Sequence, residues 1–215
     1  MIRLPGVIGL TGLYCAGKNR VAALMEQRGV PALDLDKLGH RALESEKARI
    51  VERFGGGVLA PDGSVDRRLL AEIVYKRRNA GDLAALEAIV HPTVNALADR
   101  WIEDAAIKGA AANGAVPDLC VVNAALIHKS AVFSRMRALV IVKAPFPIRL
   151  CRARIRDELP VGEIFRRFRI QSTFNSQYLA AKTDIYTIDN SGFSGSAANL
   201  EKRLDEILTR IREKL

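Results

Sequence analysis

The chain has 215 residues, with 33 lysines and arginines against 24 aspartates and glutamates, and its formal net charge at pH 7 is +9. This length favours one domain that folds without disulfide bonds, and the excess of positive charge indicates an anionic partner. Aromatic residues make up 6% of the chain and do not alternate with basic residues, which argues against a surface for single-stranded nucleic acid.

The cysteines Cys15, Cys120 and Cys151 are widely spaced and form no Cys-x-x-Cys pair. Such a set is typical of a reducing compartment and is not the pattern of a structural metal site. The stretch from Met1 to Gly6 is too short and interrupted for a signal peptide, and no apolar run approaches the roughly 18 residues of a membrane-spanning helix. We therefore expect a cytoplasmic protein.

The first predicted element is a strand from Val7 to Leu10, and a helical pattern runs from Val21 to Gln27. The residues that follow the strand fit the first seven positions of the pattern G-x-x-x-x-G-K-[ST]: Gly12, Leu13, Tyr14, Cys15, Ala16, Gly17 and Lys18. A strand, a glycine loop and a helix in this order indicate a phosphate-binding loop. Its backbone N–H groups would surround phosphate oxygens, and Lys18 would reach the β- and γ-phosphates.

Asn19 stands at the eighth position of this pattern, where Ser or Thr normally helps to hold Mg²⁺. Two other interpretations of the loop therefore remain open. One is an ordinary glycine turn between a strand and a helix, with Lys18 as a solvated lysine at the start of the helix. The other is a loop that binds a nucleotide without catalysis.

The segment Gly29-Val30-Pro31 ends the first helix, and Ala32 to Asp34 is predicted to be a short strand with Asp34 at its carboxyl end. Helical spacing returns from Lys37 to Phe54. Three further helices are predicted from Asp66 to Tyr75, from Asp82 to Val90 and from Thr93 to Lys108, with His91-Pro92 separating the last two.

The segment from Gly109 to Pro117 is predicted to be a loop, and apolar runs at Leu119 to Val122 and Ala138 to Val142 predict buried strands. The remaining predictions are helices from Ile148 to Asp157 and Phe165 to Tyr178, a strand from Thr183 to Ile188 and a helix from Ala197 to Leu215. This alternation predicts an α/β fold with a parallel sheet, whose ligands bind at the carboxyl ends of the strands.

The chain resembles the dephospho-CoA kinase family from the glycine loop to the terminal helix. No single motif is decisive, but their order and spacing together are specific. The similar segments are Val7 to Arg20 (ending in the pattern L-T-G-x-x-x-S-G-K-S-T), Gly29 to Asp36 (G-V-P-V-I-D-A-D), Gly63 to Leu70 (G-S-L-D-R-R-x-L), Leu86 to Pro92 (L-E-x-I-x-H-P), Arg152 to Asp157 (R-x-x-x-R-D) and Ile188 to Gly192 (I-D-N-S-G).

The resemblance implies transfer of the ATP γ-phosphoryl group to the 3′-hydroxyl of dephospho-CoA, the last step of coenzyme A biosynthesis, with Mg²⁺ as cofactor. It also implies one P-loop kinase domain over residues 1–215, with a helical substrate subdomain at about 58–108 and an arginine-rich lid at about 149–178. We expect ATP and dephospho-CoA as partners, and neither nucleic acid nor membrane.

Asp34 is the candidate catalytic base or orienting acceptor, because a carboxylate at a strand end can take the proton of an acceptor hydroxyl. The simpler alternative is that Asp34 and Asp36 both cap the next helix. His91 is a candidate for substrate binding, or it simply ends a helix before Pro92.

Arginines crowd the segment from Arg149 to Arg169, and their planar forks suit phosphate oxygens. Most of them fit a solvated helix face equally well. Family positions single out Arg152 and Lys18 for catalysis, Arg156 for ATP binding and Arg167 for substrate binding. Arg154 is a lesser candidate. The full set expected to bind ATP is Gly12, Leu13, Tyr14, Cys15, Ala16, Gly17, Lys18, Asn19, Arg20 and Arg156.

The sequence departs from the family pattern at three places. Asn19-Arg20 replaces Ser-Thr, Ala125 to Lys129 replaces P-L-L-F-E, and Asn123 ends a strand where P-loop enzymes often place a metal-binding Asp. The side-chain oxygen of Asn19 remains a candidate Mg²⁺ ligand. Two alternative functions stay open, another small-molecule or nucleotide P-loop kinase and a catalytically weak nucleotide-binding module. Cys15 is expected to be a reactive thiol, because it lies near Lys18 and a helix N-terminus.

Overall fold

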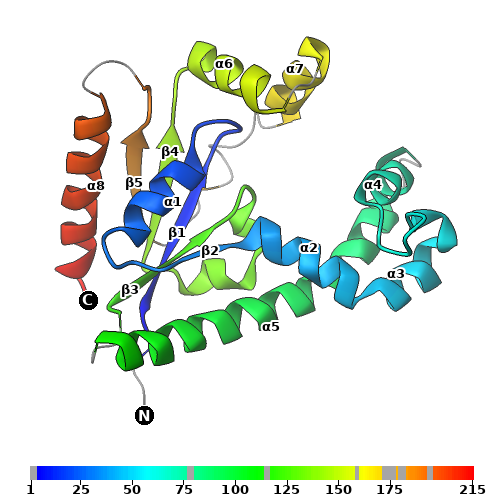
Figure 1. The fold of residues 1–215 in the computed structure, drawn as a ribbon, viewed down its shortest axis with the longest axis horizontal. Helices are drawn as coiled ribbons and strands as arrows, with labels where there is room; N and C mark the ends of the chain where they lie inside the picture. The colour runs from blue at the N-terminus through cyan, green and yellow to red at the C-terminus, as the bar shows by residue number, and fades with distance from the viewer. Residues whose placement is uncertain are drawn as a thin grey trace. The chain divides into compact units, whose positions relative to one another are not determined.

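The computed structural model describes residues 4–76, 80–113, 117–157, 160–170, 178, 183–192 and 196–215. Within these residues, five strands form one parallel sheet in the order β2-β3-β1-β4-β5 (Figure 1). The strands are β1 (Gly6–Gly12), β2 (Ala32–Asp34), β3 (Leu119–Asn123), β4 (Ala138–Lys143) and β5 (Asp184–Asp189). The predicted α/β class with a parallel sheet is confirmed.

Helices precede and follow these strands along the chain. They are α1 (Lys18–Glu26), α2 (Leu35–Ser45), α3 (Lys47–Phe54), α4 (Arg67–Lys76), α5 (Ala80–Asn113), α6 (Phe146–Asp157), α7 (Val161–Ile170) and α8 (Ser196–Arg212), with the 3-10 turns η1 (Gly56–Val58), η2 (Ile127–Lys129) and η3 (Ala131–Arg135). Among the described helices, none is long and apolar enough to cross a membrane.

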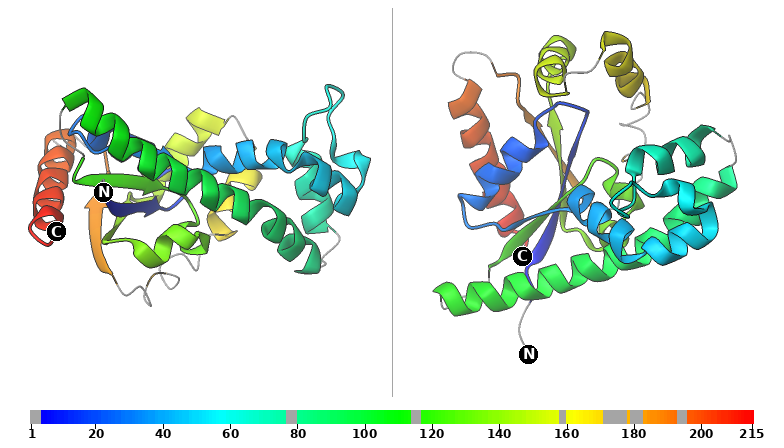
Figure 2. Two further views of the ribbon diagram at one scale, coloured as in Figure 1. Left: turned by 90° about the horizontal axis from the view of Figure 1, so that it is seen from below. Right: turned by 45° about the vertical axis from the view of Figure 1, so that its right-hand side comes forward.

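One face of the sheet packs against α1 and α8. Successive side chains of a strand point to opposite faces, so Ile8 and Leu10 of β1 lie on the same face. They share one buried cluster with Met25 of α1 and with Leu204 and Ile207 of α8. The segment that contains η2 and η3 lies on the opposite face (Figure 2). Burial on both faces explains why the central strands consist almost wholly of apolar residues.

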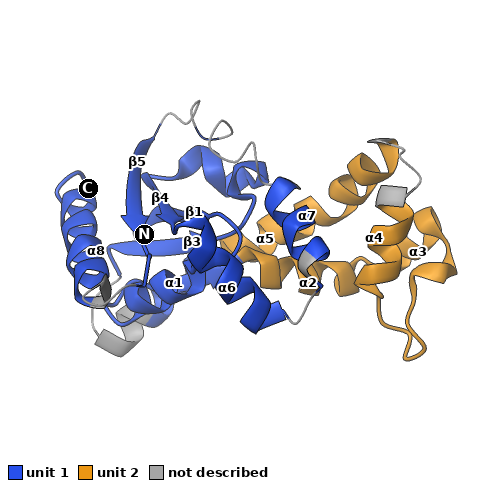
Figure 3. Cartoon of the chain, turned by 90° about the horizontal axis from the view of Figure 1, so that it is seen from above, with its two compact units in different colours: residues 1–34, 102–215 blue, residues 35–101 orange. Residues whose placement is uncertain are grey.

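The chain divides into two compact units, shown in different colours in Figure 3. Residues 1–34 and 102–215 contain the sheet, and residues 35–101 form a helical unit. The helical unit has its own core of Ile50, Val58, Val65, Leu70 and Val74. The predicted extents of a substrate subdomain at about 58–108 and of a lid at about 149–178 stay predictions.

Helix α5 corrects the prediction that His91 and Pro92 separate two helices. Pro92 lies inside one continuous helix that runs from Ala80 to Asn113, through most of the predicted loop at Gly109 to Pro117. Proline removes one intrahelical hydrogen bond, which normally ends or kinks a helix. Here apolar packing on both sides of it holds the helix, since the partly buried Ile89 and Val90 pack in the helical unit and Ala98, Ile102 and Ala106 are buried further along.

Two other helices also differ from the predictions. The pattern from Lys37 to Phe54 forms two helices, α2 and α3, which are interrupted at Glu46. The helix predicted from Phe165 to Tyr178 begins earlier, at Val161, and is described as far as Ile170. Residues 171–177 of that prediction lie outside the described residues.

Candidate active site

The loop of residues 13–17 connects β1 to α1 at the carboxyl edge of the sheet (Figure 1). The N-cap residue of α1 is Gly17, which has no side chain to accept a hydrogen bond from the first turn. That first turn also carries no acidic residue. The first-turn N–H groups and the positive end of the helix dipole therefore face the loop, and no acidic side chain of that turn compensates them. This is the backbone arrangement that binds phosphate oxygens.

Gly12 and Gly17 allow other segments to approach the loop closely. A Cβ atom on Gly12 would lie 2.5 Å from the backbone oxygen of Val142 in β4. A Cβ atom on Gly17 would lie 2.1 Å from Nδ2 of Asn190, and Gly17 also has a φ of 94° that only glycine adopts readily. Both glycines of the motif are therefore required by the packing around the loop.

Asn190 and Arg152 hold the carbonyl oxygen of Ala16. The amide of Asn190, which is 3% exposed, donates to this oxygen at 2.9 Å, and Arg152 Nη1 donates to it at 3.3 Å. Arg152 Nη2 also donates to the backbone oxygen of Asn190 at 2.9 Å. Because a trans peptide group is planar, fixing the carbonyl of Ala16 also fixes the opposite direction of the Gly17 N–H group. Arg152 thus supports the loop from the protein side.

Asp34 and the phosphate loop lie on the same edge of the sheet. Asp34 ends β2 and is in register with Asn123, which ends β3 and is in register with Leu10 of β1. Two strand spacings place the backbone of Asp34 roughly 10 Å from β1. Asp34 is half-buried, as is Lys18 at the start of α1. The predicted base and the predicted phosphate-binding lysine therefore both belong to the sheet-containing unit.

Asn19 and Asn123 form a pair of amides beside the loop. Asn123 Nδ2 donates to Asn19 Oδ1 at 2.9 Å. Asn123 is 4% exposed, and its Oδ1 is a buried oxygen without a hydrogen-bond partner in the described part of the chain. The pair carries no charge, and no group of three His, Cys, Asp or Glu side chains suited to a metal occurs among the described residues.

Helices α6 and α7 together are called the arm below, and Tyr14 connects the loop to both of them. The Tyr14 hydroxyl donates a hydrogen bond to Oδ2 of Asp157 at the end of α6. Arg156 holds the same carboxylate through two contacts, Nε to Oδ1 at 2.6 Å and Nη2 to Oδ2 at 2.9 Å. Arg167 of α7 lies 3.5 Å from Asp157 Oδ2 and donates to the Tyr14 hydroxyl at 3.4 Å.

The ring of Tyr14 also faces both guanidinium groups, with Arg156 at 5.2 Å and Arg167 at 5.7 Å from its centroid. Hydrogen bonding from Arg156 is the main cause that lowers the pKa of Asp157 to about 2, and the same contact raises the pKa of Arg156. Burial is the main cause that raises the pKa of Tyr14. At neutral pH the group thus carries two positive charges and one negative charge, a surplus that favours an anion.

An apolar contact joins the arm to the same loop. The side chain of Cys15 is buried with Ala153 of α6 and Ile164 of α7. The expectation that Cys15 is a reactive thiol is wrong, because burial raises its pKa and outweighs the opposing effects of Arg156 and Lys18. Among the described residues Cys15 is the one non-glycine with a positive φ, at 59°, and this turns its side chain into the apolar contact.

The other predicted site residues are placed as follows. Arg20 donates a hydrogen bond to Asn190 Oδ1 at 3.4 Å, so it contacts the same side chain that holds the Ala16 carbonyl. Arg154 is exposed on α6. His91 and Asp36 belong to the helical unit, His91 within α5 and Asp36 in the first turn of α2. Their predicted roles stay predictions.

Sequence reasoning missed the roles of Asn190 and Asp157. Both lie in motifs that the sequence presents, the I-D-N-S-G segment and the R-x-x-x-R-D segment. A sequence motif does not show which residue its side chains will contact, however. The loop residues that Asn190 and Asp157 contact are more than 140 positions away along the chain. The structure supplies these long-range partners.

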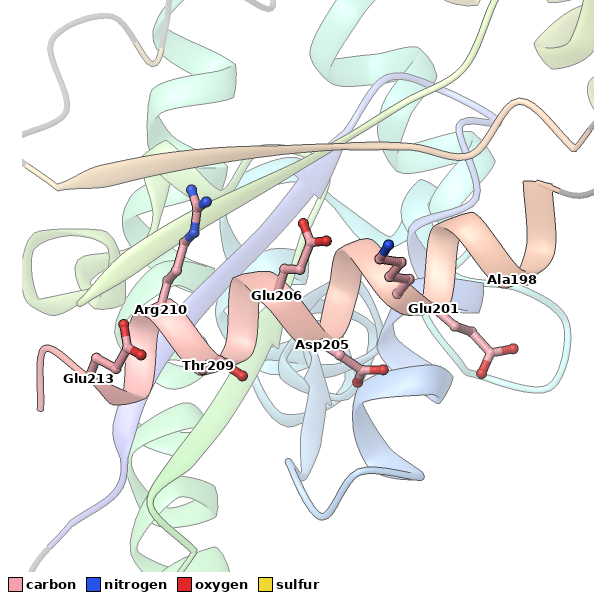
Figure 4. A pocket seen from close by; sticks show the side chains of 8 residues that line it. Ala198, Glu201, Asp205, Glu206, Thr209, Arg210 and Glu213 are labelled. Carbon is pink, nitrogen blue, oxygen red and sulfur yellow. The ribbon is translucent and has the colours of Figure 1, made fainter.

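A surface depression lies along α8 (Figure 4), and its lining contains none of the loop, arm or Asp34 residues. It is lined by Ala198, Glu201, Lys202, Asp205, Glu206, Thr209, Arg210 and Glu213. All of these belong to one helix, and Glu201 and Asp205 already pair with Arg28 at 3.3 and 2.5 Å. We therefore place the candidate site at the loop and not at this depression.

Sequence and structure comparisons with known proteins point to one family. The family model described as dephospho-CoA kinase (CoaE) matches residues 6–194. The chain is 31% identical to the dephospho-CoA kinase of Geobacter sulfurreducens over 94% of this chain and 96% of that protein. It is 34% identical to the dephospho-CoA kinase of Anaeromyxobacter dehalogenans over 92% of this chain and 90% of that protein. A crystal structure from Thermus thermophilus is similar with a TM-score of 0.76 and 29% identity, covering 99% of both chains.

Proposed function

Because the chain belongs to the dephospho-CoA kinase family, a family of phosphotransferases, we propose that it transfers the ATP γ-phosphoryl group to the 3′-hydroxyl of dephospho-CoA. We also propose that it does so in the cytoplasm, as the last step of coenzyme A biosynthesis. The observation that carries the proposal is the position of Asp34 on the same sheet edge as the phosphate loop, with Asn123 between them in register.

Phosphoryl transfer needs positioning and charge stabilisation more than covalent help from the protein. The backbone amides at the start of α1 would hold phosphate oxygens, and Lys18 would neutralise charge on the β- and γ-phosphates. Asp34 would accept the proton of the attacking hydroxyl or orient it in line with the γ-phosphate. A carboxylate two strands away from the loop suits this role, because the acceptor must lie beyond the γ-phosphate.

The arginines have separate roles in this proposal. Arg152 would keep the loop in its binding conformation through Ala16 and Asn190, and would share in stabilising the transferred group. Arg156 would bind ATP and Arg167 would bind the acceptor, each from the arm. His91 would contact dephospho-CoA from the helical unit, which we propose as the substrate subdomain.

ATP is the co-substrate, and Mg²⁺ is the cofactor that we propose with it. The unpartnered oxygen of Asn123 and the side-chain oxygen of Asn19 are hard ligands of the kind Mg²⁺ prefers, so the residues fit the ion. When bound, the ion would neutralise phosphate charge. Because both amides are neutral, this pair by itself offers little attraction to a free cation, and the phosphates of ATP would supply most of it. Asn19 Oδ1 has a second lone pair, so it can keep its bond to Asn123.

The test is a phosphotransfer assay with ATP, Mg²⁺ and dephospho-CoA, in which the 3′-phosphorylated product is identified by mass spectrometry. Asp34→Asn should lower turnover by about 10²-fold or more, since it removes the proton acceptor. Asp36→Asn is the matched control, because it changes the same group two positions along the chain. Equal turnover of native protein and Asp34→Asn would show that Asp34 only caps a helix.

The amide pair also motivates a second candidate, a nucleotide-binding module with weak catalysis. This module would bind ATP but transfer no phosphoryl group to dephospho-CoA. Activity on a nucleoside monophosphate without activity on dephospho-CoA would instead support another P-loop kinase. The same assay with a panel of acceptors distinguishes the three functions.

A further inference from the structure

We propose that Tyr14 is a positioning residue of the ATP site, which holds Asp157, Arg156 and Arg167 of the arm against the phosphate loop before ATP binds. This inference rests on the proposed function, since it takes ATP as the ligand of the loop. It differs from the predicted role of Tyr14 as one more ATP-binding loop residue, because here the side chain acts through the arm.

The first step of the argument is the place of Tyr14 in the contacts between loop and arm. Its hydroxyl contacts Asp157 and Arg167, and its ring faces Arg156 and Arg167. Its edge packs against Phe168 of α7, with ring centroids 5.4 Å apart at 74°. One side chain of the loop therefore contacts both helices of the arm.

The second step concerns charge. Arg156 and Arg167 repel each other, and bringing both to one place requires a negative charge or a π face between them. Asp157 supplies the charge, and the Tyr14 ring supplies the face, whose quadrupole attracts cations. The contacts of Asp157 with Arg156 use Nε and Nη2, and among the described residues Nη1 has no acceptor and can take one from a ligand. The arrangement keeps a surplus positive charge beside a loop suited to phosphate.

The third step is that the arm has its own rigid aromatic support. The ring of Phe168 also packs against Phe146, the first residue of α6, with centroids 4.9 Å apart at 58°, and Arg149 lies 4.8 Å from the ring centroid of Phe168. Tyr14 therefore does not contact a loose helix end but the edge of a packed aromatic group. Arginines positioned in this way lose less side-chain entropy when phosphate arrives.

The experiment compares Tyr14→Leu, which removes ring and hydroxyl, with Tyr14→Phe, which removes the hydroxyl alone. Tyr186→Phe is the matched control, because it removes a tyrosine hydroxyl on β5 outside the site. Hydrogen exchange of the nucleotide-free protein should be about tenfold faster in residues 146–157 and 161–170 of Tyr14→Leu, and the ATP dissociation constant should rise about tenfold. Tyr14→Phe should show a smaller change of both kinds.

Equal arm exchange and ATP affinity in Tyr14→Leu and Tyr186→Phe would overturn the proposal. If Tyr14→Leu does not fold, a double-mutant cycle of Tyr14→Phe with Asp157→Asn decides instead. The double variant should then bind ATP no more weakly than Asp157→Asn alone, and additive losses would contradict a shared action. Both readouts are independent of dephospho-CoA. They therefore decide this inference even if the protein proves inactive on that acceptor.

Discussion

The side-chain amide of Asn190 donates a hydrogen bond of 2.9 Å to the carbonyl oxygen of Ala16, and so connects the end of β5 to the phosphate loop across 174 positions of the chain. The carbonyl has a second donor in Arg152, and the amide is almost fully buried. The Asn190 contact is the shorter of the two that hold the peptide group preceding α1. Its removal should therefore affect both the stability of the protein and its binding of phosphate.

Asn190→Ala should lower the free energy of unfolding by about 1–3 kcal/mol, because it removes a buried donor and leaves a small cavity. ATP affinity should fall as the Ala16–Gly17 peptide group gains freedom. Urea unfolding and calorimetric ATP titration measure the two effects. Asn199→Ala, on the exposed face of α8, is the control and should change neither. Unchanged ATP affinity in Asn190→Ala would show that Arg152 alone holds the loop.

Gly17→Ala should abolish or strongly weaken ATP binding. The added methyl group would lie 2.1 Å from Asn190 Nδ2, and a φ of 94° is unfavourable for alanine. Gly39→Ala provides the matched control, because no atom lies within 4 Å of its new Cβ and the residue lies inside α2. That control should raise stability by roughly 0.5–1 kcal/mol. Native ATP affinity in Gly17→Ala would refute the close packing described for the loop.

Asn19→Leu should cut phosphotransfer sharply and weaken the Mg²⁺ dependence of ADP affinity, because it deletes an oxygen ligand. Asn19→Ser should shift the Mg²⁺ concentration needed for half-maximal activity while leaving metal-free ADP binding nearly unchanged. Asn123→Asp should lower that concentration, because it places a charge beside the ion. If Asn19→Leu keeps native activity and Mg²⁺ dependence, Asn19 does not serve the metal. If the native protein binds ATP without phosphotransfer and Asn19→Ser gains that activity, the chain is better described as a nucleotide-binding module with weak catalysis.

Cys151 should be the one thiol that an alkylating reagent labels readily in the native protein. It is exposed on α6, whereas Cys15 and Cys120 are buried. Burial raises the pKa of Cys15, and it raises the pKa of Cys120 to about 12. Cys151→Ser should therefore remove nearly all labelling until the protein is unfolded, as counted by intact mass. Rapid labelling of Cys15 in this variant would mean that the arm does not cover the loop in solution.

The contribution of Asp157 to stability should depend on pH in one direction only. Its pKa in the folded protein, about 2, lies below the ordinary value of 3.8. The stabilisation is therefore fully present above the ordinary pKa and is lost as pH falls through the folded pKa. The difference in melting temperature between native protein and Asp157→Asn should stay constant from about pH 5 to 8 and shrink below about pH 4. A difference that grows toward acid would contradict the Arg156 and Tyr14 contacts.

The sequence determined the parts of this protein that depend on neighbouring residues. Apolar runs predicted β1, β3 and β4, since these strands are buried on both faces and need no polar alternation. The short strand β2 and the edge strand β5 were also predicted, although neither is a continuous apolar run. The glycine loop between β1 and α1 followed from its own motif, and Asp34 was placed correctly at the end of β2. The sequence misplaced helix boundaries, above all at Pro92, because buried contacts on both sides of the proline outweigh its local preference to end a helix.

Only the tertiary structure decided what the loop contacts. The hydrogen bonds of Asn190 to Ala16 and of Tyr14 to Asp157 join residues 174 and 143 positions apart. Cys15 shows the consequence, since its neighbours in sequence predicted a reactive thiolate, whereas Ala153 and Ile164 bury it. The physical reason is that burial and charge pairing depend on distance in space. A local pattern contains no information about which distant segment will supply the partner.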